Sequence, residues 1–530
     1  MLPALWHRYI FLFGIIGLAC GMLFGTVPTS IPQIILAANW LLEKNFSDKL
    51  RQLKSNRIFL ILTTLFILHV IGIIYTENMQ QGLNELRNKL PLLTLPIILF
   101  STIPLSKKEF RLLFHFYLLS ILVSTVCCYL VYAGYTKKTV IDVRNASVFM
   151  SHIRFSLYVA FAVTALIYFI VKEKKILLRL MYTLLIGWLL FVMFKLQMVT
   201  GFLCLLIAGG ILIFVLSIKH LKKTVAFALS ISMLILLGLG LNSALSSLNM
   251  FEAEISSGAN KLLKTSKSGR ILFHDTLSKI AENGNLVFIN INVYELENTW
   301  NQRSKIKFDE FDRKGNEIKF TSLRYLASKG LTKDSAGVAS LSDEDVTAIQ
   351  NGTSNYKYSI NKGLLSRWRG LVWEYTKYKR GENPSGHTLM MRLEFWKIAS
   401  YIIHDHPVFG VGTGDVQDAF NEMYVRTNSK LDAVWRLRCH NQYLAITVAF
   451  GIIGAAIFLF YLFYPAILLR KKIHFLYWPF FIIAILSFLT EDTLETQAGV
   501  TFFIFFQCLF LWPASFREND SATESTSHSA

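Results

Sequence analysis

The chain has 530 residues, of which 53% are hydrophobic and 14% aromatic, and its mean hydropathy is +0.43. This composition is too apolar for a soluble protein with an ordinary surface, and it predicts a polytopic α-helical membrane protein. The formal net charge of +19 does not indicate a nucleic-acid partner, because the basic residues form short clusters between apolar runs, as in cytoplasmic loops.

Apolar runs that could cross a membrane recur along the chain and predict about twelve spans. They cover residues 8–27, 29–43, 57–75, 89–103, 110–134, 153–171, 178–195, 200–217, 224–243, 441–469, 474–490 and 497–515. The runs at 29–43 and 89–103 are short and interrupted by proline, so they could be tilted, broken or re-entrant. The first run is expected to stay as a membrane helix, since its apolar core is longer than that of a signal peptide and no clear Ala-x-Ala site follows.

The basic clusters predict which loops face the cytoplasm. They are Lys44–Arg57, Lys107–Arg111, Lys172–Arg179, Lys219–Lys223 and Arg470–Lys472. Placing all of them inside requires both short runs to cross and puts both chain ends in the cytoplasm, although Lys137 and Lys138 then fall outside. The predicted order is N-terminal membrane helices over 1–243, an extracytoplasmic region over 244–439, C-terminal membrane helices over 440–515 and a disordered cytoplasmic tail over 516–530.

The extracytoplasmic region is expected to contain a small mixed α/β subdomain. Its β-prone stretches are Leu286–Tyr294, Lys305–Asp312 and Glu317–Phe320, the last two joined by a Gly315-Asn316 turn. Its helical stretches are Ser322–Lys329 and Ser342–Ile349, the second with a weak capping signal from Ser342 and Asp345. Nothing in this subdomain has a catalytic pattern, so a lid or a partner surface is its expected role.

The cysteines give no sign of a disulfide framework or a zinc site. All but Cys439, which lies at an outer boundary, fall within apolar runs.

The stretch from Met391 to Gly454 carries the residues on which a functional prediction depends. Arg392 and Trp396 stand four residues apart and share one face of a predicted helix that Pro407 ends. Glycines then alternate with other residues at Gly410, Gly412 and Gly414. Such spacing suits a tight turn or a backbone close to a ligand, and taken alone it is read more simply as a plain turn.

A histidine stands where the next long apolar run begins. His440, Asn441 and Gln442 come directly before the stretch Tyr443–Leu469, which has no charged residue. An imidazole at a membrane boundary can exchange a proton near neutral pH, so His440 is a candidate base. The alternative is a histidine that anchors a helix end at the interface.

These motifs together resemble the signature region of the O-antigen ligase and polymerase superfamily. The resemblance is carried by Arg392-x-x-x-Trp396, by His406-Pro407-x-x-Gly410-x-Gly412-x-Gly414, and by His440-Asn441-Gln442-Tyr443-Leu444 followed by Gly451 and Gly454. It implies transfer of a glycan from a lipid diphosphate carrier to an acceptor hydroxyl, with Arg392 holding phosphate oxygens and His440 activating or orienting the acceptor. We expect Gly410, Gly412, Gly414 and Asn441 to bind the substrate.

The chain departs from the superfamily pattern at a second arginine, which usually lies in a Ser-Arg-Thr-Gly-like piece. Here that region reads Gln197-Met198-Val199-Thr200-Gly201, so the arginine is absent. Lys195 and Arg154 are the candidate replacements. We favour Arg154 because a charge that enters an apolar segment is costly unless it has a role, although it could also be an interfacial anchor.

Acidic residues cluster at the outer end of the last predicted hairpin. Glu491, Asp492 and Glu495 could hydrogen-bond sugar hydroxyls, steady the arginines, bind a cation or simply form a solvated turn, and we assign Glu491 and Glu495 to substrate binding. The first outer loop, from Gly25 to Ser30, lacks the carboxylates of metal-dependent oligosaccharyltransferases. The prediction is therefore an enzyme with no metal and no cofactor.

The resemblance implies a glycosyltransferase of the bacterial inner membrane that uses an undecaprenyl-diphosphate-linked glycan donor and a lipid or glycan acceptor on the periplasmic face. An O-antigen ligase is the primary prediction, and a polysaccharide polymerase of the same superfamily is the alternative. A transporter or flippase for the lipid-linked glycan is the rival from another class. It would be favoured by ionisable residues in the middle of spans and by two similar halves, neither of which is evident.

Overall fold

The computed structural model describes residues 3–136, 143–220, 232, 261–278, 280–357, 371–372, 374–375, 378–379, 381–470 and 473–512, with the backbone alone for 213–220. By its contacts the chain divides into two units, which we describe separately. The membrane unit consists of residues 1–226 and 391–530, and the inserted unit consists of residues 227–390. Residues 391–439 thus pack with the membrane helices. The predicted span 224–243, apart from residue 232, and the predicted tail 516–530 lie outside the described residues.

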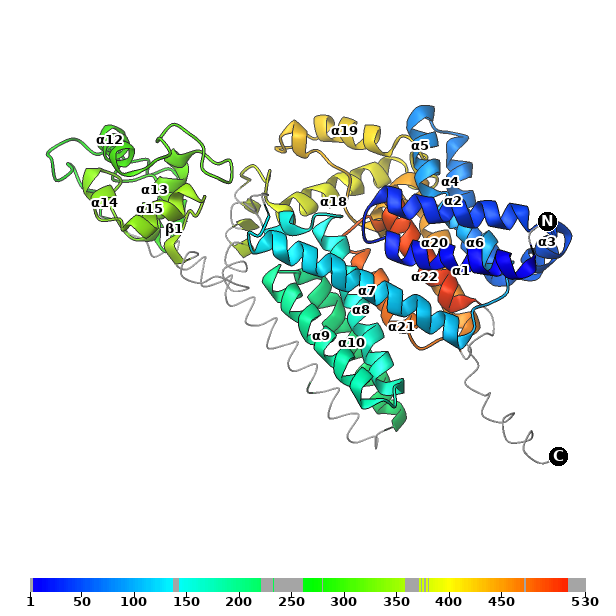
Figure 1. Ribbon diagram of the computed structural model, residues 1–530. Helices are drawn as coiled ribbons and strands as arrows, with labels where there is room; N and C mark the ends of the chain where they lie inside the picture. The colour runs from blue at the N-terminus through cyan, green and yellow to red at the C-terminus, as the bar shows by residue number, and fades with distance from the viewer. Residues whose placement is uncertain are drawn as a thin grey trace. The chain divides into compact units, whose positions relative to one another are not determined.

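The membrane unit is helical throughout its described part (Figure 1). Its helices are α1 (Ala4–Gly21), α2 (Thr26–Leu42), α3 (Phe46–Ser55), α4 (Arg57–Ile73), α5 (Met79–Lys89), α6 (Pro91–Phe100), α7 (Lys107–Tyr132), α8 (His152–Lys172), α9 (Ile176–Lys195), α10 (Val199–His220), α18 (Thr388–Asp405), α19 (Val416–Arg426), α20 (Gln442–Leu469), α21 (Tyr477–Ser487) and α22 (Gln497–Leu511), with short 3₁₀ turns η1 (Val143–Ala146), η2 (Ala433–Trp435) and η3 (Thr493–Glu495). Helix α22 packs against α6, α20 packs against α4, and α8 packs against α9 and α10.

Several described helices are long and apolar enough to cross a membrane. They are α1, α7, α8, α9 and α20, and α3 with α4 adds a sixth if the two helices, which meet at 88°, form one bent span. The short predicted runs at 29–43 and 89–103 are helical as α2 and α6, which have 17 and 10 residues. A crossing typically takes about 20 residues, so α2 is at the lower limit of the usual range and α6 is below it. The structure therefore confirms a polytopic helical protein, and the count of about twelve spans stays a prediction.

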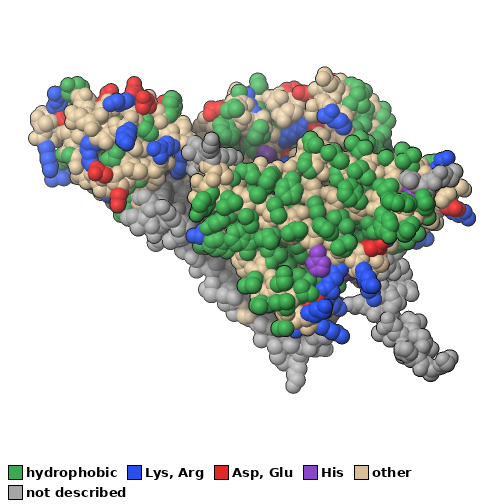
Figure 2. Space-filling model, in the orientation of Figure 1, with side chains coloured by type: hydrophobic (Ala, Val, Ile, Leu, Met, Phe, Trp, Pro, Cys, Tyr) green, Lys and Arg blue, Asp and Glu red, His purple; other side chains and the backbone are tan. Residues whose placement is uncertain are grey.

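Large apolar side chains lie on the surface of the membrane unit. Figure 2 shows hydrophobic side chains covering much of the face over α1, α2 and α7. Phe13, Ile34 and Leu119 of these helices are among the exposed ones. Exposing such a surface to water is unfavourable, whereas exposing it to the hydrocarbon of a bilayer is not.

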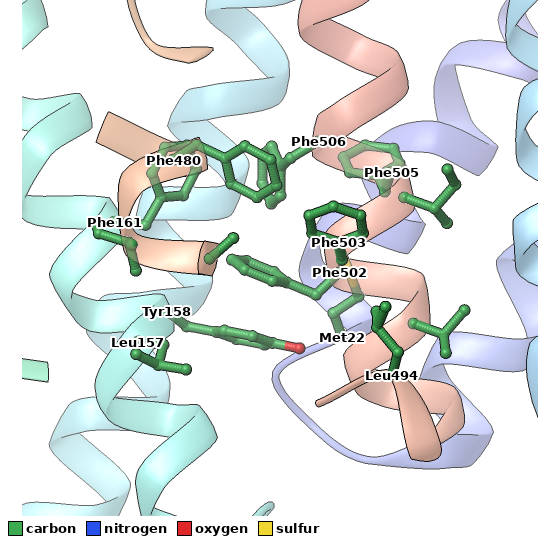
Figure 3. Packing of buried hydrophobic residues seen from close by; sticks show 14 of the residues in the cluster. Met22, Leu157, Tyr158, Phe161, Phe480, Leu494, Phe502, Phe503, Phe505 and Phe506 are labelled. Atoms are coloured by element: carbon green, nitrogen blue, oxygen red, sulfur yellow. The ribbon is translucent and has the colours of Figure 1, made fainter. Parts of the chain in front are cut away.

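An aromatic core joins the helices that lead into the candidate site (Figure 3). The rings of Tyr158 on α8 and Phe502 on α22 stack with centroids 4.0 Å apart, and the rings of Phe161 and Phe506 lie 4.8 Å apart. Because such pairs stabilise by more than their buried area alone, they fix α8 against α22. Arg154 lies one helical turn before Tyr158, and Glu491 to Glu495 lie just before α22, so the core sets the position of both.

Helix α20 is broken at Gly451, and the glycine-rich turn fits into the break. Gly451 has φ +63° and ψ −162°, which interrupts the helical backbone. The turn fills the break with backbone hydrogen bonds: Val411 N donates to Val448 O at 3.0 Å, Gly412 N to Ala449 O at 2.9 Å, and Ile452 N to Pro407 O at 2.9 Å. Non-helical backbone at membrane depth is tolerated where protein satisfies its polar groups in this way.

Replacing Gly451 by alanine is expected to lower the thermal unfolding midpoint of the purified protein by several degrees. A Cβ there would lie 2.2 Å from the carbonyl carbon and oxygen of Val408, and this backbone conformation, which is essentially restricted to glycine, costs an L-residue roughly 1–3 kcal/mol before any clash. Gly187→Ala on α9 is the control, since a Cβ there meets nothing within 4 Å. Equal midpoints for both variants would contradict this packing.

The inserted unit has its own buried core and is mainly helical in its described part. Its elements are β1 (Ala281–Glu282), β2 (Asn285–Leu286), α12 (Val293–Arg303), α13 (Ile318–Ser328), α14 (Ser335–Ala339) and α15 (Asp343–Gln350). The two strands form one antiparallel pair in which Ala281 faces Leu286 and Glu282 faces Asn285. Trp300, Ile318 and Leu326 are fully buried in the core.

The helical predictions for the inserted unit are confirmed, whereas the predicted strands are wrong. Ser342 and Asp345 form a reciprocal capping box at the start of α15, and α13 covers most of 322–329. The predicted strand 286–294 has only short bridges, and it ends where the Asn292 side chain accepts from Glu295 N and starts α12. In the predicted hairpin only Phe311 and Glu317 pair, because Ile318 already begins α13.

Candidate active site

Arg392 lies on α18 with its guanidinium against a buried carboxylate. Its Nη2 donates to Glu491 Oε1 at 2.8 Å, and the two side chains are 15% and 8% exposed. One turn further along α18, Trp396 Nε1 donates to Cys439 O at 2.9 Å. Arg392 and Trp396 therefore lie on one face of α18, as the four-residue spacing predicts. Through this face, α18 contacts both Glu491 and Cys439, the residue before His440.

His440 lies just before α20 and faces Asp492. Its Nδ1 is 3.3 Å from Asp492 Oδ1, within ion-pair range although outside hydrogen-bond geometry, and its ring lies 5.8 Å from that of Phe395. Burial lowers the pKa of His440, but the contact with Asp492 and the charges of Asp492 and Glu491 raise it by more. The net shift raises the pKa of His440 above the ordinary imidazole value, because the neighbouring carboxylates favour the protonated ring.

Arg154, in the first turn of α8, reaches the same carboxylates. Its charge favours the ionised forms of Glu491 and Asp492. Like Arg392, it has a buried Nε without a hydrogen-bond partner among the described residues. The rival candidate Lys195 instead has its Nζ over the ring of Phe191, 5.7 Å from the centroid. Of the two candidate replacements, the structure brings Arg154 to the site residues.

Glu491 and Asp492 are adjacent carboxylates with opposite pKa shifts. Burial raises the pKa of Glu491 above its usual range, although the charges of His440 and Arg392 offset part of the rise. Burial also raises the pKa of Asp492, but the contact with His440 and the charge of that residue lower it by more, so the net shift is downward. Carboxylates whose environments separate their pKa values can take different roles in one site. Asp492 was named in the sequence only as part of an acidic cluster, so its contact with His440 was missed.

His440, Glu491 and Asp492 also meet the distance requirement for holding a metal ion, since one ligand atom from each lies within 4.8 Å of the others. In this arrangement Arg392 already occupies an oxygen of Glu491, and His440 already faces Asp492. These pairings satisfy the charges without an ion. That the site needs no metal stays a prediction.

Glu495 belongs to a different group of buried charges. Lys89 Nζ donates to Glu85 Oε2 at 2.9 Å and to Glu495 Oε2 at 2.8 Å, and Arg438 Nη2 lies 2.9 Å from Glu85 Oε1. Gln442 Nε2 donates to Glu495 Oε1 at 2.9 Å. Its contacts are thus with protein, which differs from the predicted contact with substrate. The sequence signal for this group was the Glu85–Lys89 pair, four residues apart at the start of an apolar run.

The remaining predicted site residues have contacts that explain them structurally. Asn441 caps α20 by accepting from Leu444 N at 3.1 Å, and its Nδ2 donates to Leu489 O at 3.1 Å. A Cβ on Gly410 would lie 2.4 Å from Ala449, and one on Gly414 would lie 2.3 Å from Asn78 O. Gly412 has φ +99°. These glycines allow close backbone packing, and their predicted contact with substrate remains a prediction.

Comparison with known proteins supports one family. The family model described as O-antigen ligase matches residues 347–459, which contain Arg392, the glycine-rich turn and His440. Arg154 and the carboxylates at 491 and 492 lie outside the matched residues and join the site through the fold. A search of curated proteins found no match. The family match, with the arginine and histidine motifs within it, supports the O-antigen ligase and polymerase superfamily for this part of the chain.

Proposed function

We propose that the protein transfers a glycan from an undecaprenyl-diphosphate-type carrier to an acceptor hydroxyl on the periplasmic face of the bacterial inner membrane, as an O-antigen ligase does. The family match over residues 347–459 supports the coarser function, a ligase- or polymerase-like membrane glycosyltransferase. The observation that carries the finer proposal is the pair of buried Nε–H groups of Arg154 and Arg392 near His440 and its carboxylates; neither Nε–H group has a hydrogen-bond partner among the described residues. Buried unpaired donors call for an acceptor, and diphosphate oxygens supply several.

In the proposed reaction, the acceptor oxygen forms a bond to the anomeric carbon of the glycan while the bond from that carbon to the diphosphate oxygen breaks. The proton of the acceptor hydroxyl passes to His440, and the electron pair of the broken bond leaves with the carrier diphosphate. Negative charge therefore grows on the leaving group, where permanently protonated guanidinium groups stabilise it most. Arg154 and Arg392 are assigned to that role.

Asp492 determines which nitrogen of His440 acts as the base in this proposal. It lies at Nδ1, so we place the proton of the neutral imidazole there and assign Nε2 to accept the acceptor proton. Glu491 holds Arg392 by one nitrogen, which orients the guanidinium and leaves other donors for phosphate.

The test is transfer by purified protein in lipid nanodiscs, which enclose no second compartment. A polyprenyl-diphosphate-linked glycan is supplied alone or with a lipid A–core acceptor. A ligase forms product only with the acceptor, a polymerase lengthens chains on the donor alone, and a transporter forms no product in either mixture. An EDTA arm is expected to leave the rate unchanged. Loss of activity that added divalent cations restore would instead assign His440, Glu491 and Asp492 to a metal.

The pH dependence of transfer gives an independent prediction. Because the pKa of His440 is raised, the base form appears only above the ordinary imidazole value, and the wild-type kcat should rise with a midpoint above about 6.5. Asp492→Asn removes the main raising interaction and leaves burial, so the midpoint should move to lower pH while kcat falls. Asp418→Asn on the exposed part of α19 is the control. An unmoved or raised midpoint in Asp492→Asn would contradict the assigned pair.

A further inference from the structure

Four charged side chains form a buried cluster beside the candidate site. The buried charge cluster consists of Glu85, Lys89, Arg438 and Glu495. Lys89 bridges the two glutamates, and Arg438 contacts Glu85 at 2.9 Å and Glu495 at 3.8 Å. Two positive and two negative groups balance, and Lys89 is only 1% exposed. Buried charges are costly unless they are paired this fully, and they are weak evidence for stability, so another role is worth seeking.

The cluster leaves no room for a substrate. The adjoining cavity, lined by His69, Lys89, Arg438 and Glu495 among others, has a volume of about 10 Å³. This space suits at most one water molecule. Direct chemistry on a glycan or a diphosphate is therefore excluded for these residues, and any effect on transfer must act through their neighbours.

Those neighbours are the residues on either side of His440. Arg438 stands two residues before it and Gln442 two residues after it, and both are held by Glu495. Gln442 also accepts from Leu494 N at 2.7 Å, and its own N donates to Phe488 O at 2.8 Å. The chain is thus fastened on both sides of His440 to the segment that carries Asp492.

His440 itself needs such fastening because its backbone is in the left-handed region, with φ +46°. An L-residue other than glycine keeps this conformation only where its surroundings impose it, and such residues gather at functional sites. The groups that face its ring are Asp492, Glu491 and Arg392, with Arg154 beyond the carboxylates. A small shift of the backbone would therefore change the distance between Nδ1 and Asp492.

We propose that the buried charge cluster is a positioning device that holds His440 against Asp492, and that Lys89 and Arg438 are positioning residues for glycan transfer. The inference rests on the proposed function of His440. It extends the site to Lys89 on α5, which is far in sequence from the residues that the family match covers. Lys89 contacts no reacting group, so its effect should appear in kcat and not in the affinity for the donor.

Lys89→Met is the informative variant because a purely electrostatic effect and a positioning effect predict opposite shifts in the pKa of His440. By simple electrostatics, the loss of a positive charge near His440 would raise the pKa of that histidine. If the cluster positions His440, its loss loosens the contact with Asp492, and burial then lowers the pKa. The readout is the rate at which diethyl pyrocarbonate modifies His440 in substrate-free protein in nanodiscs, followed by mass spectrometry across pH, since this reagent attacks neutral imidazole.

The expected result for Lys89→Met is a lower modification midpoint than in wild type and a kcat reduced by about 10- to 100-fold, with the donor KM unchanged. Lys89→Arg should restore most of kcat because it keeps the charge. Lys49→Met is the matched control: Lys49 is also buried, bonds to Trp40 O at 2.8 Å and pairs with Glu43 at 2.8 Å, away from the site. It should leave the midpoint and kcat as in wild type.

A midpoint that rises or stays the same in folded Lys89→Met would overturn the positioning role. Should that variant fail to fold, Arg438→Lys gives the same test, since it keeps the charge but cannot reach both glutamates, and its midpoint should also fall. A lowered midpoint in a protein that shows no transfer even as wild type would support the positioning of His440 and refute the proposed function instead. The two failures are therefore distinguishable.

Discussion

Replacing His440 by alanine should reduce kcat for glycan transfer by about a hundredfold to ten-thousandfold, the usual contribution of a positioned general base. The acceptor hydroxyl would lose the group that takes its proton, while Arg154 and Arg392 would still hold the carrier diphosphate. Transfer by purified variant protein in nanodiscs measures the loss. In cells, unreacted lipid-linked glycan should accumulate while the protein remains inserted.

His404→Ala is the matched control for this variant. His404 lies near the end of α18 with its side chain 88% exposed, and it pairs with Asp405 outside the site. It should transfer at the wild-type rate. If His440→Ala also kept the wild-type rate, His440 would be an interfacial anchor and the chemistry would rest on the arginines alone.

Arg392→Lys should lower kcat/KM by about a hundredfold to a thousandfold, in the range found when one donor to a developing negative charge is removed. Lysine keeps the charge but has no planar fork, so it cannot hold Glu491 and phosphate oxygens together with fixed geometry. Steady-state transfer at several donor concentrations measures the change.

Arg426→Lys on α19 is the control for loss of an arginine fork, because Arg426 forms an exposed ion pair with Asp405 at 2.6 Å. Exposed pairs of this kind contribute little, so transfer should be unaffected. Full activity in Arg392→Lys would mean that two-point binding of phosphate is not required.

The local sequence carries the signal of the residues that we assign to the candidate site, whose roles remain predictions. Arg392 and Trp396 share a helix face by spacing alone, and His440 stands at the start of a long apolar run. Arg154 was found by the cost of placing a charge at the end of a span. The partners of these residues could not be predicted, because Asp492 and Lys89 reach the site by packing between segments far apart in sequence.

The fold shows the same division between local and distant causes. Apolar runs gave the membrane helices, since a long uncharged run has few alternatives to a helix in a bilayer. In the inserted unit, Leu286–Tyr294 alternates as a strand does, yet a strand also needs a neighbour along its length, and the cap at Asn292 turns the chain into α12 instead. The glycines at 410–414 could be recognised as a turn from the sequence. The interruption of α20 at Gly451, into which this turn packs, could not.

Donor affinity separates the proposed role of the arginines, which hold the carrier diphosphate, from that of His440, which takes the acceptor proton. Binding of a fluorescent polyprenyl-diphosphate-linked glycan is measured for wild type, His440→Ala and Arg392→Lys in nanodiscs. We expect His440→Ala to bind the donor as wild type does although it cannot transfer the glycan, and Arg392→Lys to bind the donor more weakly. Loss of donor binding in His440→Ala, or wild-type affinity in Arg392→Lys, would contradict these roles.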